Sequence, residues 1–370
     1  MRAFGIISSS GNHIYVEGMQ DYRSIGAFSF LGRYRVIDFP MSNMSNSGIE
    51  HVSVLISNNP RSLVEHLGSV RHYNINSKRG KLHVLPAASM NNVDFYNNDI
   101  SSYMHNMQAI EEVNMPYVIL APAHFVYRQD FSTLLDAHIE SGADVTMLYQ
   151  KVDNAKKFYL HCDCLNLNKQ KGVDGLEKNR GNKEEQNISL ETYVMSKDLF
   201  IKLVKKAANI SSLYWFNDII NDECNELDIR GYEHEGYVAC INDFNSYFTA
   251  NMDLLSYKKV NELFDADWPF YTRTSDSCPT LYHSDIEVTN SMVSNGCVIE
   301  GTVINSVIGR GVVVKKGAVV KNSVIFPSVT IGEDVHIENV VVDKLARVVR
   351  KKELIGLPDQ PLYVKRNDKI

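Results

Sequence analysis

The stretch VIGRGV-VVKKGA-VVKNSV-IFPSVT-IGEDVH-IENVVV, residues 307–342, decides the fold of the C-terminal part of the chain. Every sixth residue in it is a β-branched aliphatic: Val307, Val313, Val319, Ile325, Ile331 and Ile337. Four residues after each of these comes a small or aliphatic residue: Gly311, Gly317, Ser323, Val329, Val335 and Val341. A period of six fits neither the 3.6-residue turn of an α-helix nor the two-residue alternation of a half-buried strand.

Hexapeptide periods are typical of a solenoid in which each group of six residues forms one flat face of a triangular coil. We therefore predict a left-handed parallel β-helix over residues 281–370, with the six-step aliphatic series pointing into the prism. Such coils bury one another by stacking. An end coil leaves strand edges without partners, which favours assembly with another chain. The competing interpretation is a valine-rich antiparallel sheet in which this spacing arises by chance.

Before residue 250, strand-like apolar runs alternate with helix-like runs. The expected strands are residues 2–8, 51–56, 82–86, 117–121 and 144–150, and the expected helices are 42–48, 61–67, 101–112 and 131–140. This alternation predicts an α/β domain with a mostly parallel, doubly wound, Rossmann-like sheet over residues 1–250. Residues 251–280 are expected to supply a linker helix and a connection, within an amphipathic segment that starts near residue 246.

The composition excludes several classes of protein. The 370 residues carry a formal net charge of −6, whereas a general nucleic-acid binder needs a basic face. No apolar run reaches the roughly 18 residues that a membrane span needs. The six cysteines lack the paired spacing of a zinc site. We therefore expect a cytoplasmic protein that binds neither membrane nor nucleic acid.

Several motifs resemble one family. GRYRVIDFPMSN (32–43), followed by NSGI (46–49), closely resembles the GKYRIIDFPLSN…NSGI signature of ADP-glucose pyrophosphorylases. ILAPAH (119–124) is similar to the family's ILAGDH, and NDFNSY (242–247) with ANMDL (250–254) is similar to its DVGT and AN.DL segments. The repeat region is similar to the family's C-terminal β-helix. The resemblance covers nearly the whole chain and implies a nucleotidyltransferase-like domain followed by that β-helix.

The resemblance also implies a chemistry. The family makes ADP-glucose and pyrophosphate from ATP and glucose 1-phosphate, with Mg²⁺, for glycogen or starch synthesis. Because the sugar phosphate attacks the α-phosphorus of ATP, cations must hold two polyanions in line. The family supplies a glycine-rich loop with an arginine, a lysine before a proline, and two aspartates that bind metal.

This chain lacks most of those groups. Its first loop reads SSSGNHI (8–14), without the family's glycines and arginine, and its first lysine is Lys78. The family's lysine position falls on Ile25, and the first metal aspartate falls on Ala123, which has no oxygen to offer magnesium. The family's GTA substrate motif falls near residues 98–100 and is missing. We therefore expect no catalytic residues in this chain.

Four residues remain candidates for binding. Asp243 matches the second metal aspartate; it either keeps a weak metal site or bonds a nearby loop. Lys178, after Glu177, could stand for the lysine of the family's sugar-phosphate motif EKP, although the proline is missing. Arg33 and Arg35 either bind an effector anion or are surface charges beside an aromatic residue.

An intact scaffold around a degraded site matches the GlgD-type branch of the family, which accompanies a catalytic subunit in Gram-positive bacteria. The resemblance implies a regulatory or structural subunit that needs no cofactor itself, with Mg²⁺ in the partner catalytic subunit. It also implies a hetero-oligomer, expected to be a heterotetramer, with self-association and a sugar-phosphate effector as further expectations. Two alternatives stay open: an active nucleotidyltransferase with a divergent phosphate loop, and a sugar-phosphate sensor without a partner.

Overall fold

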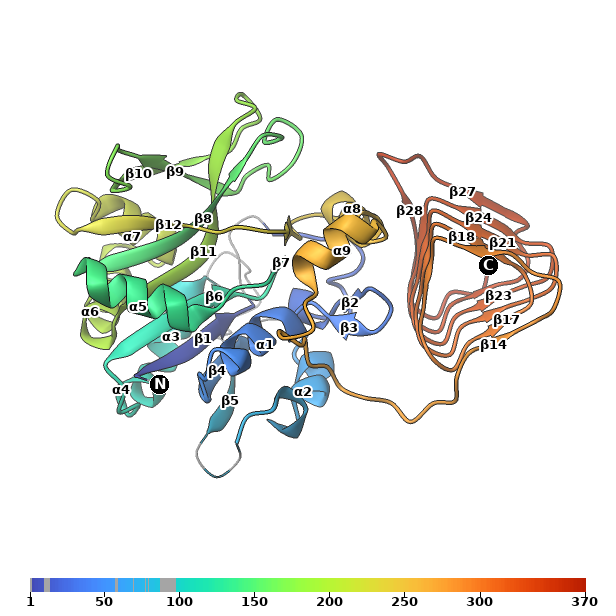
Figure 1. Cartoon of the computed structure of the whole chain (residues 1–370), viewed down its shortest axis with the longest axis horizontal. Coiled ribbons are helices and arrows are strands. Elements are labelled where there is room, and N and C mark those ends of the chain that lie inside the picture. Colours follow the sequence, from blue (N-terminus) through green and yellow to red (C-terminus); the bar gives the residue numbers. More distant parts are fainter. Residues whose placement is uncertain are drawn as a thin grey trace.

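A computed structural model of the chain describes residues 2–9, 14–56, 59–68, 70–76, 78, 80–86 and 98–370. Residues 10–13 of the first loop lie outside the described residues. Two units lie side by side, an α/β domain and a triangular β-helix (Figure 1). None of the described helices is both long enough and apolar enough to cross a lipid bilayer.

The α/β domain is built on a nine-stranded sheet in the order β10-β9-β11-β6-β1-β4-β5, with β8 paired to β11 and β12 paired to β8. Its strands are β1 (Ala3–Ser8), β4 (His51–Ile56), β5 (Lys81–Pro86), β6 (Tyr117–Pro122), β8 (Val145–Val152), β9 (Asp163–Leu167), β10 (Val173–Lys178), β11 (Gln186–Ser196) and β12 (Ile229–Glu233). Two small sheets flank it, one of β2 (Ser29–Phe30) and β3 (Tyr34–Arg35) and one of β7 (Phe125–Tyr127) and β13 (Val238–Cys240).

The expectation of a mostly parallel sheet is wrong in one half. Strand β1 runs parallel to β4 and β6, but β11 runs antiparallel to β6, β8 and β9. The chain passes from β8 to β11 through the β9–β10 hairpin. Parallel neighbours need a crossover connection, usually a helix, and this segment has none. The sheet is therefore mixed.

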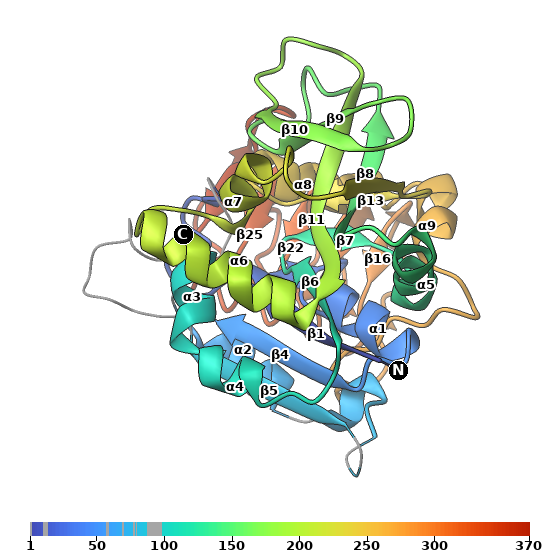
Figure 2. The same cartoon turned by 90° about the vertical axis from the view of Figure 1, so that its left-hand side faces the viewer.

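Helices cover both faces of the sheet (Figure 2). They are α1 (Asp38–Asn46), α2 (Arg61–Leu67), α3 (Asp99–His105), α4 (Met107–Glu111), α5 (Phe131–Ser141), α6 (Lys197–Ile210), α7 (Phe216–Asp222), α8 (Phe244–Asp253) and α9 (Tyr257–Leu263). Residues of α1, α2 and α5 share one apolar core with the sheet, and residues of α3, α4, α6 and α7 share the other. Helix α6 shows why: Phe200, Leu203, Val204 and Ala207 form a single buried stripe at helical spacing.

The C-terminal unit is the predicted left-handed parallel β-helix. Its three five-stranded sheets have the orders β14-β17-β20-β23-β26, β15-β18-β21-β24-β27 and β16-β19-β22-β25-β28. The strands are β14 (Leu281–Tyr282), β15 (Val288–Thr289), β16 (Met292–Val293), β17 (Val298–Ile299), β18 (Thr302–Ile304), β19 (Val307–Ile308), β20 (Val313–Val314), β21 (Val319–Lys321), β22 (Val324–Ile325), β23 (Thr330–Ile331), β24 (His336–Glu338), β25 (Val340–Val342), β26 (Arg347–Val348), β27 (Glu353–Ile355) and β28 (Leu362–Val364).

The six-step series points into the prism over only half of its length. Ile325, Ile331 and Ile337 lie inside the coil, as predicted. Val313 and Val319 do not: each is half-buried, and its neighbour, Val314 or Val320, fills the interior. Val307 is fully buried, but it packs in the cluster that joins the β-helix to the α/β domain.

The physical reason is the length of one coil. Val307 pairs with Val324, and Val324 pairs with Val341, so each of these central turns of the β-helix takes 17 residues. A strict step of six, which closes after 18 residues, therefore loses one residue of register per turn.

The two units share an apolar contact. Val307, Val324, Phe326 and Val341 of the β-helix belong to the same buried cluster as Phe28 and Tyr247 of the α/β domain. The rings of Tyr247 and Phe326 lie 6.1 Å apart, edge to face. Helices α8 and α9 precede residues 264–280, which connect the two units. This contact fixes a cleft between them.

Candidate functional site

Strands β1 and β6 end side by side, at the edge of the sheet where α/β domains bind ligands. The hollow at this edge, here called the acidic hollow, has a volume of about 30 Å³. The described residues that line it are Ser8, Asp99, Tyr103, Leu120, Ala121, Pro122, Glu191, Tyr193, Trp215, Phe216 and Asn217. Such a volume holds about two water molecules. The described residues that line it include two carboxylates and neither arginine nor lysine.

Two positions where the family resemblance expects charged groups are occupied by apolar side chains. Ile25, in a short 3-10 helix (Ile25–Ala27), is 1% exposed, and Ala123 is 0% exposed. The backbone N–H of Ala123 donates to the carbonyl oxygen of Ser8 at 2.8 Å. A Cβ placed on Gly26 would lie 3.5 Å from the Cβ of Ala123 and 3.5 Å from Leu63. Apolar side chains are therefore closely packed where the resemblance expects charged groups.

The carboxylates of the acidic hollow are held by the protein itself. Asp99 accepts the backbone N–H of Phe216 at 3.1 Å, and burial raises the pKa of Asp99 to about 7. Burial also acts to raise the pKa of Glu191, but the nearby His124 and its hydrogen bond lower that pKa below its usual value. Glu191 has a φ of 47°, a left-handed conformation that costs a non-glycine residue free energy. Negative charge at this edge opposes the binding of a polyphosphate.

Lys178 lies beside this hollow and is already paired. Its Nζ lies 2.9 Å from Oδ1 of Asp163, whose other oxygen accepts the amide of Asn217 at 2.5 Å. Asp163 is buried, which raises the pKa of its carboxyl group. The single positive charge of Lys178 therefore balances a protein carboxylate.

Asp243 caps a helix. It precedes α8, and its Oδ1 accepts the backbone N–H of Ser246 at 2.6 Å. Around Asp243, as elsewhere among the described residues, no cluster of three His, Cys, Asp or Glu side chains is placed to hold a metal ion. The residues at this edge therefore do not fit the magnesium site that the resemblance describes.

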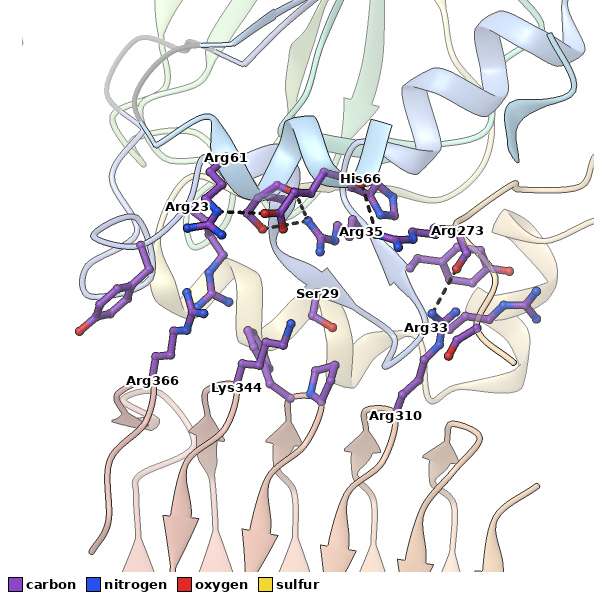
Figure 3. A pocket seen from close by; sticks show the side chains of 18 of the residues that line it. Arg23, Ser29, Arg33, Arg35, Arg61, His66, Arg273, Arg310, Lys344 and Arg366 are labelled. Atoms are coloured by element: carbon purple, nitrogen blue, oxygen red, sulfur yellow. Dashed lines mark hydrogen bonds and ion pairs between the residues drawn. The ribbon is translucent and has the colours of Figure 1, made fainter. Parts of the chain in front are cut away.

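The positive charge gathers elsewhere, in a cleft of about 490 Å³ between the α/β domain and the β-helix. In the part of the chain that the structure describes, eight cationic side chains line this arginine cleft: Arg23, Arg33, Arg35, Arg61, Arg273, Arg310, Lys344 and Arg366. Among the described lining residues, Glu65 is the one carboxylate. Figure 3 shows Arg310, Lys344 and Arg366 rising from the β-helix toward the arginines of the α/β domain.

The structure brings together the two arginines that the sequence singled out. Arg35 lies in β3 and Arg33 directly precedes this strand, and both residues line the cleft. The guanidinium of Arg33 stacks over the ring of Tyr34 at 5.7 Å. Arg35 donates from Nη1 to the carbonyl oxygen of Ser62 at 2.6 Å and to its hydroxyl at 3.0 Å. Arg35 is thereby oriented by α2.

Sequence reasoning missed the other six cations. Arg310, Pro327 and Lys344 stand 17 residues apart and line the cleft from successive coils, so the coil length would have revealed that they share one column. Nothing in the sequence alone connects these coil positions to Arg23 or Arg61.

The cleft holds more positive charge than its own contacts neutralise. Burial, followed by Arg33, lowers the pKa of Arg310, and burial, followed by Arg35, lowers the pKa of Lys344. Within the described chain, the buried Nε atoms of Arg310 and Arg366 have no hydrogen-bond partner. A cleft with such an excess of positive charge favours an anionic ligand.

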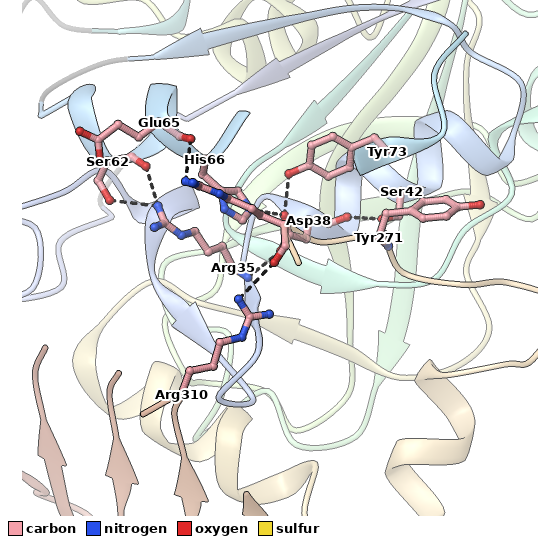
Figure 4. Close-up of polar contacts among 10 residues, drawn as sticks. Arg35, Asp38, Ser42, Ser62, Glu65, His66, Tyr73, Tyr271 and Arg310 are labelled. Carbon is pink, nitrogen blue, oxygen red and sulfur yellow. Dashed lines mark hydrogen bonds and ion pairs between the residues drawn. The ribbon is translucent and has the colours of Figure 1, made fainter. Parts of the chain in front are cut away.

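A buried carboxylate orders the floor of the cleft (Figure 4). Asp38 is 0% exposed, and its Oδ1 contacts Nε2 of His66 and the hydroxyl of Tyr73, each at 2.6 Å. Its Oδ2 accepts the backbone N–H of Arg35 at 2.8 Å. Burial acts to raise the pKa of Asp38, but the charge and hydrogen bonds of its neighbours, led by His66, lower it overall. This network fixes the position of Arg35 relative to α2.

Comparisons with known proteins agree with this architecture. Residues 23–256 match the nucleotidyl transferase family, and residues 280–360 match the GlmU-like C-terminal hexapeptide family. The glycogen biosynthesis protein GlgD of Bacillus subtilis (strain 168) is 29% identical over 362 residues, which cover 98% of this chain and 95% of that protein. GlgD of Geobacillus stearothermophilus is 33% identical, with 80% of this chain and 76% of that protein covered. The glucose-1-phosphate adenylyltransferase of Clostridioides difficile (strain 630) is 31% identical, with 73% and 71% covered.

Proposed function

The chain belongs to the nucleotidyl transferase family, among the GlgD-type glycogen biosynthesis proteins and the glucose-1-phosphate adenylyltransferases, and we propose that it is a regulatory subunit without catalytic activity of its own. Its role lies in glycogen biosynthesis. In this proposal it modulates a catalytic relative that makes ADP-glucose from ATP and glucose 1-phosphate.

The single observation that carries the proposal is the composition of the sheet edge. Adenylyl transfer needs cations around the phosphates and carboxylates around a metal. Here the acidic hollow has carboxylates where a triphosphate would need cations, and Ala123 stands where a metal ligand would be needed. Lys178 is paired with Asp163. These features argue against the alternative of an active enzyme with a divergent loop.

The arginine cleft supports an effector role for a phosphorylated ligand. Its cations come from both units, with Arg33 and Arg35 on one side and Arg310, Lys344 and Arg366 on the other. A sugar phosphate placed between them would relieve repulsion within each group and join the two units. Such a ligand acts on a partner only through contacts that differ between the partner's active and inactive states.

The β-helix supports association with a homologue. Strands β14, β15 and β16 of the first coil have a paired neighbour on one side only among the described residues. Leu281 and Tyr282 of this coil are 65% and 48% exposed. Unpaired edges next to exposed apolar side chains favour assembly. A chain with the shape of its relatives can take a relative's place in a symmetric oligomer, and we propose a heterotetramer.

The test is an assay of three samples: this chain, a catalytic relative, and their mixture, each supplied with Mg²⁺, ATP and glucose 1-phosphate. We expect this chain alone to turn over at less than a tenth of a typical enzyme rate of roughly 10 s⁻¹. The mixture should elute as one larger species on size exclusion, with higher activity or a changed effector response. Full activity of the chain alone would support the divergent-enzyme alternative. Effector binding without association would support the sensor alternative.

A further inference from the structure

Two buried thiols touch each other outside the acidic hollow and the arginine cleft. The Sγ atoms of Cys162 and Cys240 lie 3.5 Å apart, and the residues are 7% and 6% exposed. All six cysteines are described, and all are free thiols. The two are 78 positions apart in sequence, so their contact is a product of the tertiary fold.

Hydrogen bonds on both sides hold the two backbones in place. The hydroxyl of Tyr159 donates to the carbonyl oxygen of Val238 at 2.9 Å, which ties the turn before Cys162 to β13. The amide of Asn242 donates to the carbonyl oxygen of Leu160 at 2.7 Å, on the other side of Cys240. The chain segments that carry the thiols are therefore already aligned, and a bond between the sulfurs needs an approach of about 1.5 Å.

One of these two cysteines borders a hollow. Cys240 lines a second hollow of about 180 Å³, together with Tyr159, Tyr237 and Asp243. The neighbouring thiol of Cys164 does not line it and is 2% exposed.

We propose that Cys162 and Cys240 form a reversible disulfide under oxidising conditions, and that this disulfide is a redox latch between the 153–162 turn and β13. With hydrogen peroxide as oxidant, the thiolate of Cys240 attacks one peroxide oxygen, the O–O bond breaks, and hydroxide leaves and is protonated to water. The sulfur of Cys162 then attacks the sulfenic sulfur, the S–O bond breaks, and a second water leaves. The two thiols lose two electrons and two protons in total, and the peroxide is reduced to two waters.

The latch has two expected consequences. The disulfide would close a loop between two residues that are 78 positions apart. It should stabilise the folded chain, because the cross-link restricts the unfolded state. Burial raises the pKa of the Cys240 thiol, so the reaction should be slow at neutral pH and accelerate as the pH rises.

The experiment uses the full chain with Cys278, the exposed thiol, changed to Ser to prevent cross-linking between chains. This Cys278→Ser protein is treated with hydrogen peroxide and digested without reduction, and linked peptides are mapped by mass spectrometry. We expect a Cys162–Cys240 peptide, a melting temperature raised by at least about 3 °C, and reversal of both by dithiothreitol.

Cys164→Ser is the matched control, because it removes a second buried thiol two positions along the chain from Cys162. It should leave the linked peptide unchanged, whereas Cys162→Ser should abolish it. The inference is overturned if the Cys278→Ser protein yields no such peptide, or if it links Cys240 to another cysteine. Mapping the Cys278→Ser protein alone decides the question even where an additional substitution impairs folding.

Discussion

Arg23 and Asp343 form a buried ion pair that joins the α/β domain to the β-helix. Nη2 of Arg23 lies 2.7 Å from Oδ1 and 2.6 Å from Oδ2 of Asp343, and the side chains are 7% and 0% exposed. The hydroxyl of Tyr363 donates to the same carboxylate at 2.5 Å. The pair also takes one of the eight cleft cations out of the set available to a ligand.

Removing the carboxylate of Asp343 should therefore destabilise the folded chain. We expect Asp343→Asn to lower the free energy of unfolding by about 3–5 kcal/mol, because it leaves the charge of Arg23 buried without a partner. Urea unfolding followed by circular dichroism measures this. Asp228→Asn is the control, since the Asp228–Arg230 pair is exposed and should contribute less than about 1 kcal/mol. Equal effects of the two variants would contradict a special role for the buried pair.

The arginine cleft should bind phosphorylated ligands through both units. Arg310→Ala removes a β-helix guanidinium that lines the cleft, and should weaken the binding of a sugar phosphate about tenfold. Isothermal titration calorimetry with glucose 1-phosphate and with inorganic phosphate measures the change. Arg230→Ala, on the surface away from the cleft, should bind as the unaltered chain does. Identical affinities for the two variants would place the ligand elsewhere.

Features of the fold that depend on residues close together in the sequence could be predicted, and features that depend on distant residues could not. The β-helix was predictable because its period is local, but the direction of Val313 and Val319 was not. Each side chain's direction depends on the 17-residue coil, which is set by corner geometry and by stacking. The antiparallel run of β11 was missed because it depends on which strand the chain returns to after the β9–β10 hairpin.

The candidate site also has a part that the sequence could indicate and a part that it could not. The loss of charged groups at Ile25 and Ala123 is a prediction from the motifs, because Ala123 stands within ILAPAH and Ile25 lies at a fixed distance before GRYR. The arginine cleft was only partly visible, through Arg33 and Arg35. Its remaining cations, such as Arg61 and Arg366, resemble ordinary surface charges until the tertiary fold brings them to one place.

The acidic hollow should make the stability of the chain depend on pH. Burial raises the pKa of Asp99 to about 7, whereas in the unfolded chain its pKa is near 3.8. The unfolded state therefore releases this proton at a lower pH, and stability falls as the pH rises from about 4 to about 7. Between pH 5 and pH 8 the ionisation of Asp99 should lower the free energy of unfolding by about 2–3 kcal/mol.

Asp99→Asn tests this, since the amide oxygen can still accept the backbone N–H of Phe216. The variant should be more stable than the unaltered chain at pH 8 and should show a flatter pH profile, as measured by urea unfolding at pH 5 and pH 8. Asp222→Asn, at the end of α7 and hydrogen-bonded to Tyr214, is the control and should leave the slope unchanged. A slope that stays the same in Asp99→Asn would mean that Asp99 ionises normally.

The last prediction concerns association with a catalytic relative, and it uses the register of the coil. Ile331 lies inside the prism at 0% exposure, stacked between Val314 and Val348. Ile331→Asp buries an unpaired charge there and should destabilise the β-helix by more than about 4 kcal/mol. If the two chains associate through their β-helices, this variant should lose both co-elution with the catalytic subunit on size exclusion and any change in that subunit's activity.

Val313→Asp separates the effect of a lost coil from the effect of an added charge. Val313 points outward in the ladder that also contains Thr330 and Arg347, so an aspartate there stays hydrated and has a cation on the same face. This variant should fold, co-elute and modulate the catalytic subunit as the unaltered chain does. Activation that survives in Ile331→Asp after circular dichroism shows that its β-helix is lost would rule out the β-helix as the contact surface. Assembly would then have to run through the α/β domain, for example along β5 or β10 at the two ends of the described sheet.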